Sequence, residues 1–181
     1  MKTDPIGRRD VLKAALGVGV GLQLNDRASL RPQEGDLLVK AGDTRSTPLV
    51  PGDIPAGAPP TLAWAMDPAD KTVRSGSRLN ALLLLRLDPE RLAPETRSRA
   101  ANGVVAYTTI CTHNGCDIDD WVAADRHLVC SCHESIFDPT DAAKVVDGPA
   151  PRALPALPLT IVDGRLVVAK PFTAPVGYEK G

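Results

Sequence analysis

The chain has 181 residues, of which 43% are hydrophobic, and this size suits one compact domain with a tail. The formal net charge is −1 at pH 7, which argues against nucleic acid or an anionic membrane surface as the main partner. Only six residues are aromatic (two each of Trp, Tyr and Phe), so a platform for stacking bases is not expected.

The first 28 residues are predicted to serve export or anchoring. Residues 7–13 read Gly-Arg-Arg-Asp-Val-Leu-Lys, and an apolar, glycine-rich run follows over residues 14–24. This order resembles a twin-arginine export signal, with Gly7 and Val11 where Ser or Thr and Phe are usual. A membrane-spanning helix needs about twenty apolar residues, and the run is shorter. We expect residues 1–28 to be a twin-arginine signal or a weak N-terminal anchor, with a basic cytoplasmic N-terminus as the alternative.

Residues 29–60 are predicted to form an extended segment rich in Pro and Gly. Proline fixes φ and removes a backbone donor, which excludes regular structure over most of this segment. The prolines that do so are Pro48, Pro51, Pro55, Pro59 and Pro60. One short strand is expected over residues 36–40. The segment is expected to wrap over the domain or to contact a partner, with a disordered linker as the alternative.

Residues 61–181 are predicted to form an all-β domain. Short apolar or alternating runs bounded by Gly and Pro predict an antiparallel β-sandwich. Its strands are expected over residues 61–66, 80–87, 104–110, 126–130, 157–162 and 165–169. The last two strands should form a hairpin about the turn Asp163-Gly164. A short helix is expected within residues 89–101, with Asp88 as its cap.

Two short segments hold all four cysteines and two of the three histidines. Residues 111–116 read Cys-Thr-His-Asn-Gly-Cys, and residues 130–135 read Cys-Ser-Cys-His-Glu-Ser. Each segment follows a predicted strand, so both are expected as loops at strand ends. Thiolate and imidazole ligands suit zinc, copper and iron–sulfur clusters. A structural zinc site could use two Cys and two His, although its pairs usually segregate as Cys with Cys and His with His.

The pattern Cys-Thr-His-x-Gly-Cys followed by Cys-x-Cys-His-x-Ser resembles the Rieske iron–sulfur signature, closely so over about residues 107–151. The resemblance implies a Rieske-like antiparallel β-sandwich with a small cluster-binding subdomain, about residues 105–152. Two ligand loops and a proline loop, residues 148–151, would form this subdomain. One 2Fe–2S cluster per chain is implied as the cofactor. The chain is similar to disulfide-bearing, high-potential members, such as arsenite oxidase small subunits and cytochrome bc complex Rieske subunits.

Carried over to this chain, the resemblance implies four metal ligands. Cys111 and Cys130 would bind one iron, and His113 and His133 would bind the other. Two neutral imidazoles in place of two thiolates remove two negative charges, so adding an electron costs less and the reduction potential rises. An imidazole can also lose its outer proton, which couples electron transfer to pH in the alkaline range.

The resemblance also implies roles for residues around the ligands. Cys116 and Cys132 match the family's disulfide between the two loops, and Ser135 matches a serine whose hydroxyl bonds a bridging sulfide. Phe137 stands where the highest-potential members have a Tyr that bonds a cysteine sulfur. Since Phe has no hydroxyl to donate, we predict a lower potential than in those members.

Periplasmic one-electron transfer is the expected function, by a small redox subunit that passes electrons between a partner oxidoreductase and a cytochrome. The alternative is the Rieske subunit of a cytochrome bc (quinol–cytochrome c reductase) complex. The short N-terminal apolar run and the polar Asn114, where those relatives usually have Leu, weigh against it. A ring-oxygenase ferredoxin would lack the pair Cys116 and Cys132, and a zinc-stapled binding module would have no redox role.

The periplasm is the expected location for two reasons. A cluster assembled in the cytoplasm requires export of the folded protein, and a disulfide persists in an oxidising compartment. The expected partners are a larger oxidoreductase subunit and/or a c-type cytochrome, with no nucleic acid and at most a weak membrane association through the N-terminus. No acid–base pair or nucleophile stands out, so the chain is expected to be an electron-transfer subunit rather than a catalyst on its own.

Overall fold

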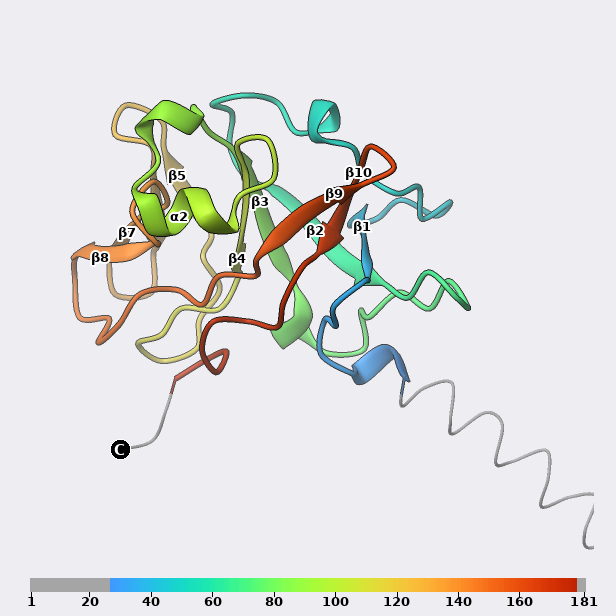
Figure 1. Cartoon of the computed structure of the whole chain (residues 1–181). Helices are drawn as coiled ribbons and strands as arrows, with labels where there is room; N and C mark the ends of the chain where they lie inside the picture. Colours follow the sequence, from blue (N-terminus) through green and yellow to red (C-terminus); the bar gives the residue numbers. More distant parts are fainter. Residues whose placement is uncertain (1–26, 179–181) are drawn as a thin grey trace, which may run out of the picture.

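The computed structural model describes residues 27–178, whose regular structure is mainly antiparallel β-sheet (Figure 1). One sheet has six strands in the order β4 (Val104–Thr108), β3 (Leu82–Arg86), β2 (Thr61–Met66), β1 (Leu37–Lys40), β10 (Arg165–Val168) and β9 (Leu159–Val162). The other sheet has four, in the order β5 (Asp120–Val122), β6 (His127–Cys130), β7 (Ser135–Asp138) and β8 (Lys144–Asp147). The predicted all-β, antiparallel class is confirmed.

The helices among the described residues are short. Residues 27–29 are helical, three further helices are 3-10 helices, η1 (Pro51–Asp53), η2 (Arg78–Asn80) and η3 (Pro89–Arg91), and α2 (Pro94–Arg99) is an α-helix. The single helix predicted within residues 89–101 is thus divided, because Pro94 has no N–H to donate and occupies the first turn of α2. Asp88 caps η3, as expected, by accepting a hydrogen bond from the Glu90 N–H at 3.1 Å.

Most predicted strands are found close to their expected bounds. The prediction for residues 61–66 coincides with β2, and the expected hairpin about Asp163-Gly164 joins β9 to β10. The strand predicted over residues 80–87 begins two residues later, since Asn80 belongs to η2. The sequence analysis missed β5, β7 and β8. All three strands have only three or four residues. Strands β5 and β8 are largely exposed, and β7 alternates buried and partly buried positions, so none of the three contains a long apolar run.

The six-stranded sheet closes on itself. Ahead of β9, the Leu157 N–H donates to the Ala106 carbonyl at 2.9 Å, and the Thr108 N–H of β4 donates to the Pro155 carbonyl at 3.1 Å. The backbone groups of the edge strand β4 are therefore partly satisfied by the segment before β9, which makes the sheet barrel-like (Figure 1).

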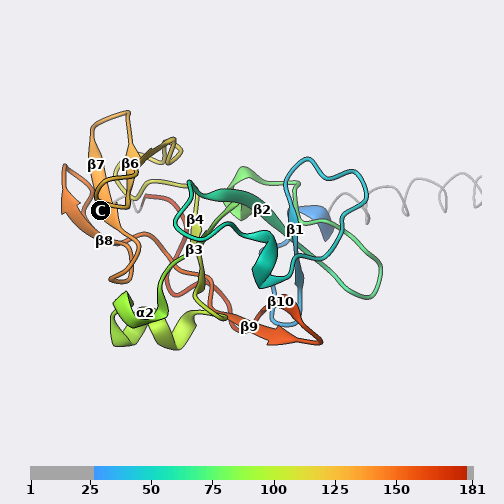
Figure 2. The same cartoon turned by 90° about the horizontal axis from the view of Figure 1, so that it is seen from above.

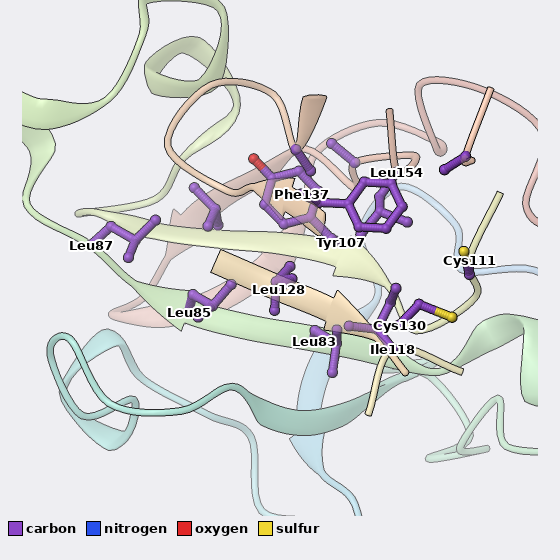
Figure 3. Packing of buried hydrophobic residues seen from close by; sticks show 14 of the residues in the cluster. Leu83, Leu85, Leu87, Tyr107, Cys111, Ile118, Leu128, Cys130, Phe137 and Leu154 are labelled. Atoms are coloured by element: carbon purple, nitrogen blue, oxygen red, sulfur yellow. The ribbon is translucent and has the colours of Figure 1, made fainter. Parts of the chain in front are cut away.

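Strand β3 is buried on both faces, which explains its unbroken run of leucines. Leu82 and Leu84 lie in the apolar core of the barrel, whereas Leu83 and Leu85 lie in a second core between the two sheets. Successive side chains of a strand point to opposite faces, so a strand between two cores needs apolar residues throughout. Figure 3 shows the second core, which joins the barrel to the four-stranded sheet.

The segment of residues 29–60 is tied into the body of the protein. It supplies β1, which lies between β2 and β10 near the middle of the six-stranded sheet. Next to β1, the buried Asp36 carboxylate accepts two hydrogen bonds from the Arg74 guanidinium, at 2.5 and 2.8 Å. Asn80, which is fully buried, donates to the carbonyls of Leu30 at 2.7 Å and Arg74 at 3.1 Å.

The predicted export signal lies almost wholly outside the described residues, which begin at residue 27. Over residues 27–178, no helix combines the length and the apolar content that a membrane crossing requires.

Candidate metal centre

Both Cys/His segments lie at the ends of strands. The first loop, residues 111–116, follows β4, whose five residues are all buried. The second loop, residues 130–135, turns β6 back into β7, and its ends Cys130 and Ser135 are register partners. Seen from above in Figure 2, the four-stranded sheet that carries the second loop stands at one end of the barrel. Two sheets packed through one core thus hold the two loops.

A disulfide joins Cys116 of the first loop to Cys132 of the second, with a Cα–Cα distance of 6.5 Å. The predicted pairing is therefore confirmed. Inside the first loop, the Cys111 N–H donates to the Cys116 carbonyl at 2.8 Å, and the Gly115 N–H donates to the Cys111 carbonyl at 3.1 Å. These bonds close the loop into a tight turn with Cys111 at its base.

The other two cysteines are free thiols at the inner side of the loops. Cys111 is 1% exposed and Cys130 is 2% exposed, and both belong to the core between the sheets. Figure 3 shows them at the same end of this core. Burial, together with the neighbouring Cys111 thiol, raises the pKa of the Cys130 thiol to about 11. A thiolate in so apolar a place needs a bound cation, which is what a metal centre supplies.

The two histidines lie on the outer side. Their ring centroids are 4.6 Å apart and the rings are nearly perpendicular, at 89°. His133 is exposed and His113 is half-buried. The Nδ1 atom of His113 is buried without a hydrogen-bond partner among the described residues, as expected of a nitrogen that ligates a metal. The third histidine, His127, lies in β6 opposite Val122.

Ser135 is the first residue of β7, at the end of the second loop. It is fully buried, and its hydroxyl has no partner within the part of the chain that the structure describes. A buried hydroxyl without a partner is rare in proteins, so this hydroxyl is available to bond a group held in the site. Free thiols, imidazoles and this hydroxyl together fit an iron–sulfur cluster.

The sulfur atoms of Cys116, Cys130 and Cys132 lie within 4.8 Å of one another. Because two of the three are bonded to each other, only Cys130 retains a thiol that can bind a metal. The disulfide thus lies directly beside one candidate ligand.

The proline loop, residues 148–151, packs against both other loops. The Thr112 hydroxyl donates to the Arg152 carbonyl, just after the proline loop, at 2.6 Å. On the other side, a Cβ atom at Gly148 would meet the Glu134 carbonyl oxygen and the Ser135 Cα at 2.6 Å. Only glycine permits this approach, and it also suits the φ of +88° at this position.

Gly148→Ala should therefore lower the free energy of unfolding by about 2–3 kcal/mol, through backbone strain and a forced displacement of the loop. Denaturant unfolding measures it. Gly164→Ala is the matched control, because that glycine has a similar φ of +76° but nothing within 4 Å of the added Cβ. The free energy of unfolding of this control variant should fall by only about 1 kcal/mol. Equal losses in the two variants would show that the proline loop is not packed as described.

Phe137 is fully buried in the core that contains both free cysteines. Phe137→Tyr should raise the midpoint potential by about 40 mV, the one-electron equivalent of a hydrogen bond of about 1 kcal/mol to a cysteine sulfur. Protein-film voltammetry measures it. The control is Tyr107→Phe, since the Tyr107 hydroxyl donates to the Pro139 carbonyl at 2.9 Å and should leave the potential unchanged. An unchanged or lower midpoint in Phe137→Tyr would contradict the role given to this position.

The contacts that hold the first loop from outside were not predictable from the sequence. The Arg78 guanidinium donates to the Gly115 carbonyl at 2.6 Å and to the Asp117 carboxylate at 3.1 Å. Arg78 is 37 residues away in the sequence from Gly115. No local pattern marks such a contact, because it depends on how η2 and the first loop meet in the fold.

Comparisons with known proteins agree with this geometry. Residues 81–158 match the family model of the Rieske [2Fe-2S] domain. The chain is 35% identical over 157 residues to the cytochrome bc1 complex Rieske iron-sulfur subunit of Streptomyces lividans, covering 82% of this chain and 89% of that protein. It is 49% identical over 76 residues to a putative respiratory nitrate reductase subunit Rieske of Haloferax mediterranei, covering 41% of this chain and 34% of that protein.

Other relatives are longer or more distant. The chain spans 43% of the bc1 complex Rieske subunit of Streptomyces coelicolor, at 35% identity over 157 residues and 82% of this chain. Among solved structures, the soluble domain of the Rieske protein II (soxF) from Sulfolobus acidocaldarius has 22% identity and a TM-score of 0.44. That likeness covers 56% of this chain and 66% of the other. Given the match over most of the Streptomyces lividans subunit, the chain belongs to the Rieske iron–sulfur protein family.

Proposed function

We propose that Cys111, Cys130, His113 and His133 hold the 2Fe–2S cluster of this chain, with the thiolates on one iron and the imidazoles on the other. The support is the division of these side chains into two buried free thiols and two outer imidazoles. A cluster ligated in this way supplies a centre that takes up one electron at a raised potential. Each side chain then has a separate task in that chemistry.

The inner thiols lie where the protein excludes water. Cys111 and Cys130 border a core of apolar side chains from both sheets, including Leu83 and Leu128. On the outer side, the exposed imidazole of His133 is the part of the site that a partner protein can reach directly. We infer that electrons enter and leave at this imidazole edge, while the disulfide between Cys116 and Cys132 keeps the two loops together.

The function that these features support is one-electron transfer as the Rieske subunit of a larger redox complex. We favour a cytochrome bc1-type complex, in which the chain would take electrons from a quinol and pass them to a cytochrome. What supports this choice is the agreement with the Streptomyces lividans bc1 subunit over 89% of its length.

A second candidate is a small redox subunit that serves a different oxidoreductase and passes electrons to a c-type cytochrome. Asn114, next to His113, is exposed and polar, where an apolar side chain would favour docking beside a quinol site. The similarity to the putative nitrate reductase subunit of Haloferax mediterranei also supports it.

In either complex, the N-terminal arginine pair and the disulfide support a periplasmic location reached by twin-arginine export.

Purification of the native complex tests both candidates. Copurification with a b-type cytochrome, together with loss of quinol-dependent cytochrome reduction upon addition of a quinol-site inhibitor, would support the bc1-type assignment. Copurification with another large oxidoreductase subunit and no b-type cytochrome would support the second.

Replacing the arginine pair Arg8 and Arg9 with lysines should leave the protein in the cytoplasm if export follows the twin-arginine route.

A further inference from the structure

We propose that the C-terminal segment, residues 173–178, is a strap that holds the proline loop over the metal centre, and that Arg152 is the positioning residue through which it acts. The proposal rests on the ligand set proposed above. It adds a part of the chain that lies far from both loops in the sequence and that no metal-binding pattern includes.

Arg152, just after the proline loop, is hydrogen-bonded both to the first loop and to the C-terminal segment. Its carbonyl accepts the hydrogen bond of the buried Thr112 hydroxyl at 2.6 Å, and Thr112 lies between Cys111 and His113. Its guanidinium nitrogen Nη2 donates to the Pro175 carbonyl at 2.8 Å and to the Gly177 carbonyl at 2.7 Å. Since the backbone and side chain of one residue make these bonds, a displacement of the C-terminal segment is passed to the first loop.

The C-terminal segment is fixed at its start as well. The Thr173 N–H donates to the Ala156 carbonyl at 2.9 Å, and the Thr173 hydroxyl accepts from the Ala156 N–H at 3.0 Å. In Figures 1 and 2 the chain after β10 leaves the barrel and runs toward the four-stranded sheet. The segment is therefore held at two points, by Ala156 near the barrel and by Arg152 beside the metal centre.

Charge-assisted hydrogen bonds such as those of Arg152 are about twice as strong as neutral ones. Losing the two bonds to the strap should make opening of the proline loop more frequent by about ten-fold, the equivalent of about 1.4 kcal/mol. Frequent opening exposes the inner side of the site to water and to small chelators. The strap therefore controls how long the site retains its metal and how much water reaches the candidate ligands.

A double-mutant cycle that starts from the full chain tests the proposal. The four proteins are the wild type, Arg152→Met, a chain that ends after Thr173, and the combination of the two changes. Two rates are measured, namely the loss of visible absorbance in the presence of an iron chelator and hydrogen–deuterium exchange of the peptide that contains residues 148–154. Each single change should raise both rates about ten-fold, and the combination should raise them no further, because both changes break the same contact.

Two further variants separate positioning from general destabilisation. Arg152→Lys keeps the charge and the donor, so it should restore much of the slow rate. Arg165→Met removes an exposed arginine of β10 and should change neither rate. The EPR spectrum of the reduced protein should shift alike in Arg152→Met and in the shortened chain, and not in Arg165→Met.

Additive effects of Arg152→Met and the shortened chain would overturn the proposal that residues 173–178 act as a strap. Rates and spectra equal to those of the wild type would also overturn it. A wild-type protein that contains no 2Fe–2S cluster would instead contradict the proposed ligand set. The two failures are thus distinguishable in the same set of measurements.

Discussion

Cys111→Ser and Cys130→Ser should each yield a protein without a 2Fe–2S cluster, whereas Cys116→Ser and Cys132→Ser should yield proteins that still assemble one. The first pair removes a thiolate from a buried site in which nothing replaces it. The second pair removes a covalent link between two loops that their own strands still position. Iron and inorganic sulfide content, measured on protein purified without oxygen, distinguishes the two outcomes.

The disulfide variants should nevertheless be less stable. A bond that closes a loop of this length contributes about 3 kcal/mol, largely by restricting the unfolded chain. Cluster loss upon heating should therefore begin at a lower temperature in Cys116→Ser and Cys132→Ser than in the wild type. If Cys111→Ser retained a full complement of iron while Cys116→Ser lost it, the assignment of ligands and bridge would have to be reversed.

Arg74→Met should reduce the free energy of unfolding by about 3–5 kcal/mol, the largest stability effect expected outside the metal centre. The side chains of Arg74 and Asp36 are each 3% exposed, and the guanidinium holds the carboxylate with two hydrogen bonds. Removing the guanidinium leaves the buried Asp36 carboxylate without the cation that it pairs with. Since Asp36 lies just before β1, the loss should loosen a strand near the middle of the six-stranded sheet.

The control for this prediction is Arg99→Met. Arg99 pairs with Glu95 on the surface of α2 at 2.5 Å, and the Glu95 side chain is 60% exposed, so this pair should contribute less than about 1 kcal/mol. Urea unfolding, followed by circular dichroism at constant pH and salt, measures both variants. Similar losses in Arg74→Met and Arg99→Met would show that the buried pair is not isolated from solvent.

The two candidate ligand loops could be predicted from the sequence because the residues that mark each loop are close together in the chain. The order of Cys, His and Ser in residues 111–116 and 130–135 carries the resemblance to the Rieske signature. That resemblance implied the candidate ligands and the disulfide, and the structure confirms the disulfide. Strand β2 was equally predictable, since an apolar run between turn residues marks its bounds. The same reasoning missed β7, although the last candidate residue of the second loop, Ser135, begins it.

What the sequence could not indicate depends on segments that meet only in the fold. Arg78 and Arg152 look like ordinary surface cations in the sequence, yet each donates hydrogen bonds to backbone carbonyls of distant segments. Asn80 was predicted to begin a strand but is a buried donor to residues near the N-terminal end of the described chain. Such contacts depend on how loops, short helices and terminal segments meet in the fold, and neither propensity nor spacing predicts them.

In the proposed centre the two iron atoms are held unequally, by sulfur on the buried side and by nitrogen on the exposed side. Metal and sulfide analysis combined with EPR of the reduced, natively produced protein tests this most directly. We predict two irons and two inorganic sulfides per chain, with an EPR spectrum typical of mixed cysteine and histidine ligation. Zinc in place of iron, or iron without inorganic sulfide, would contradict it.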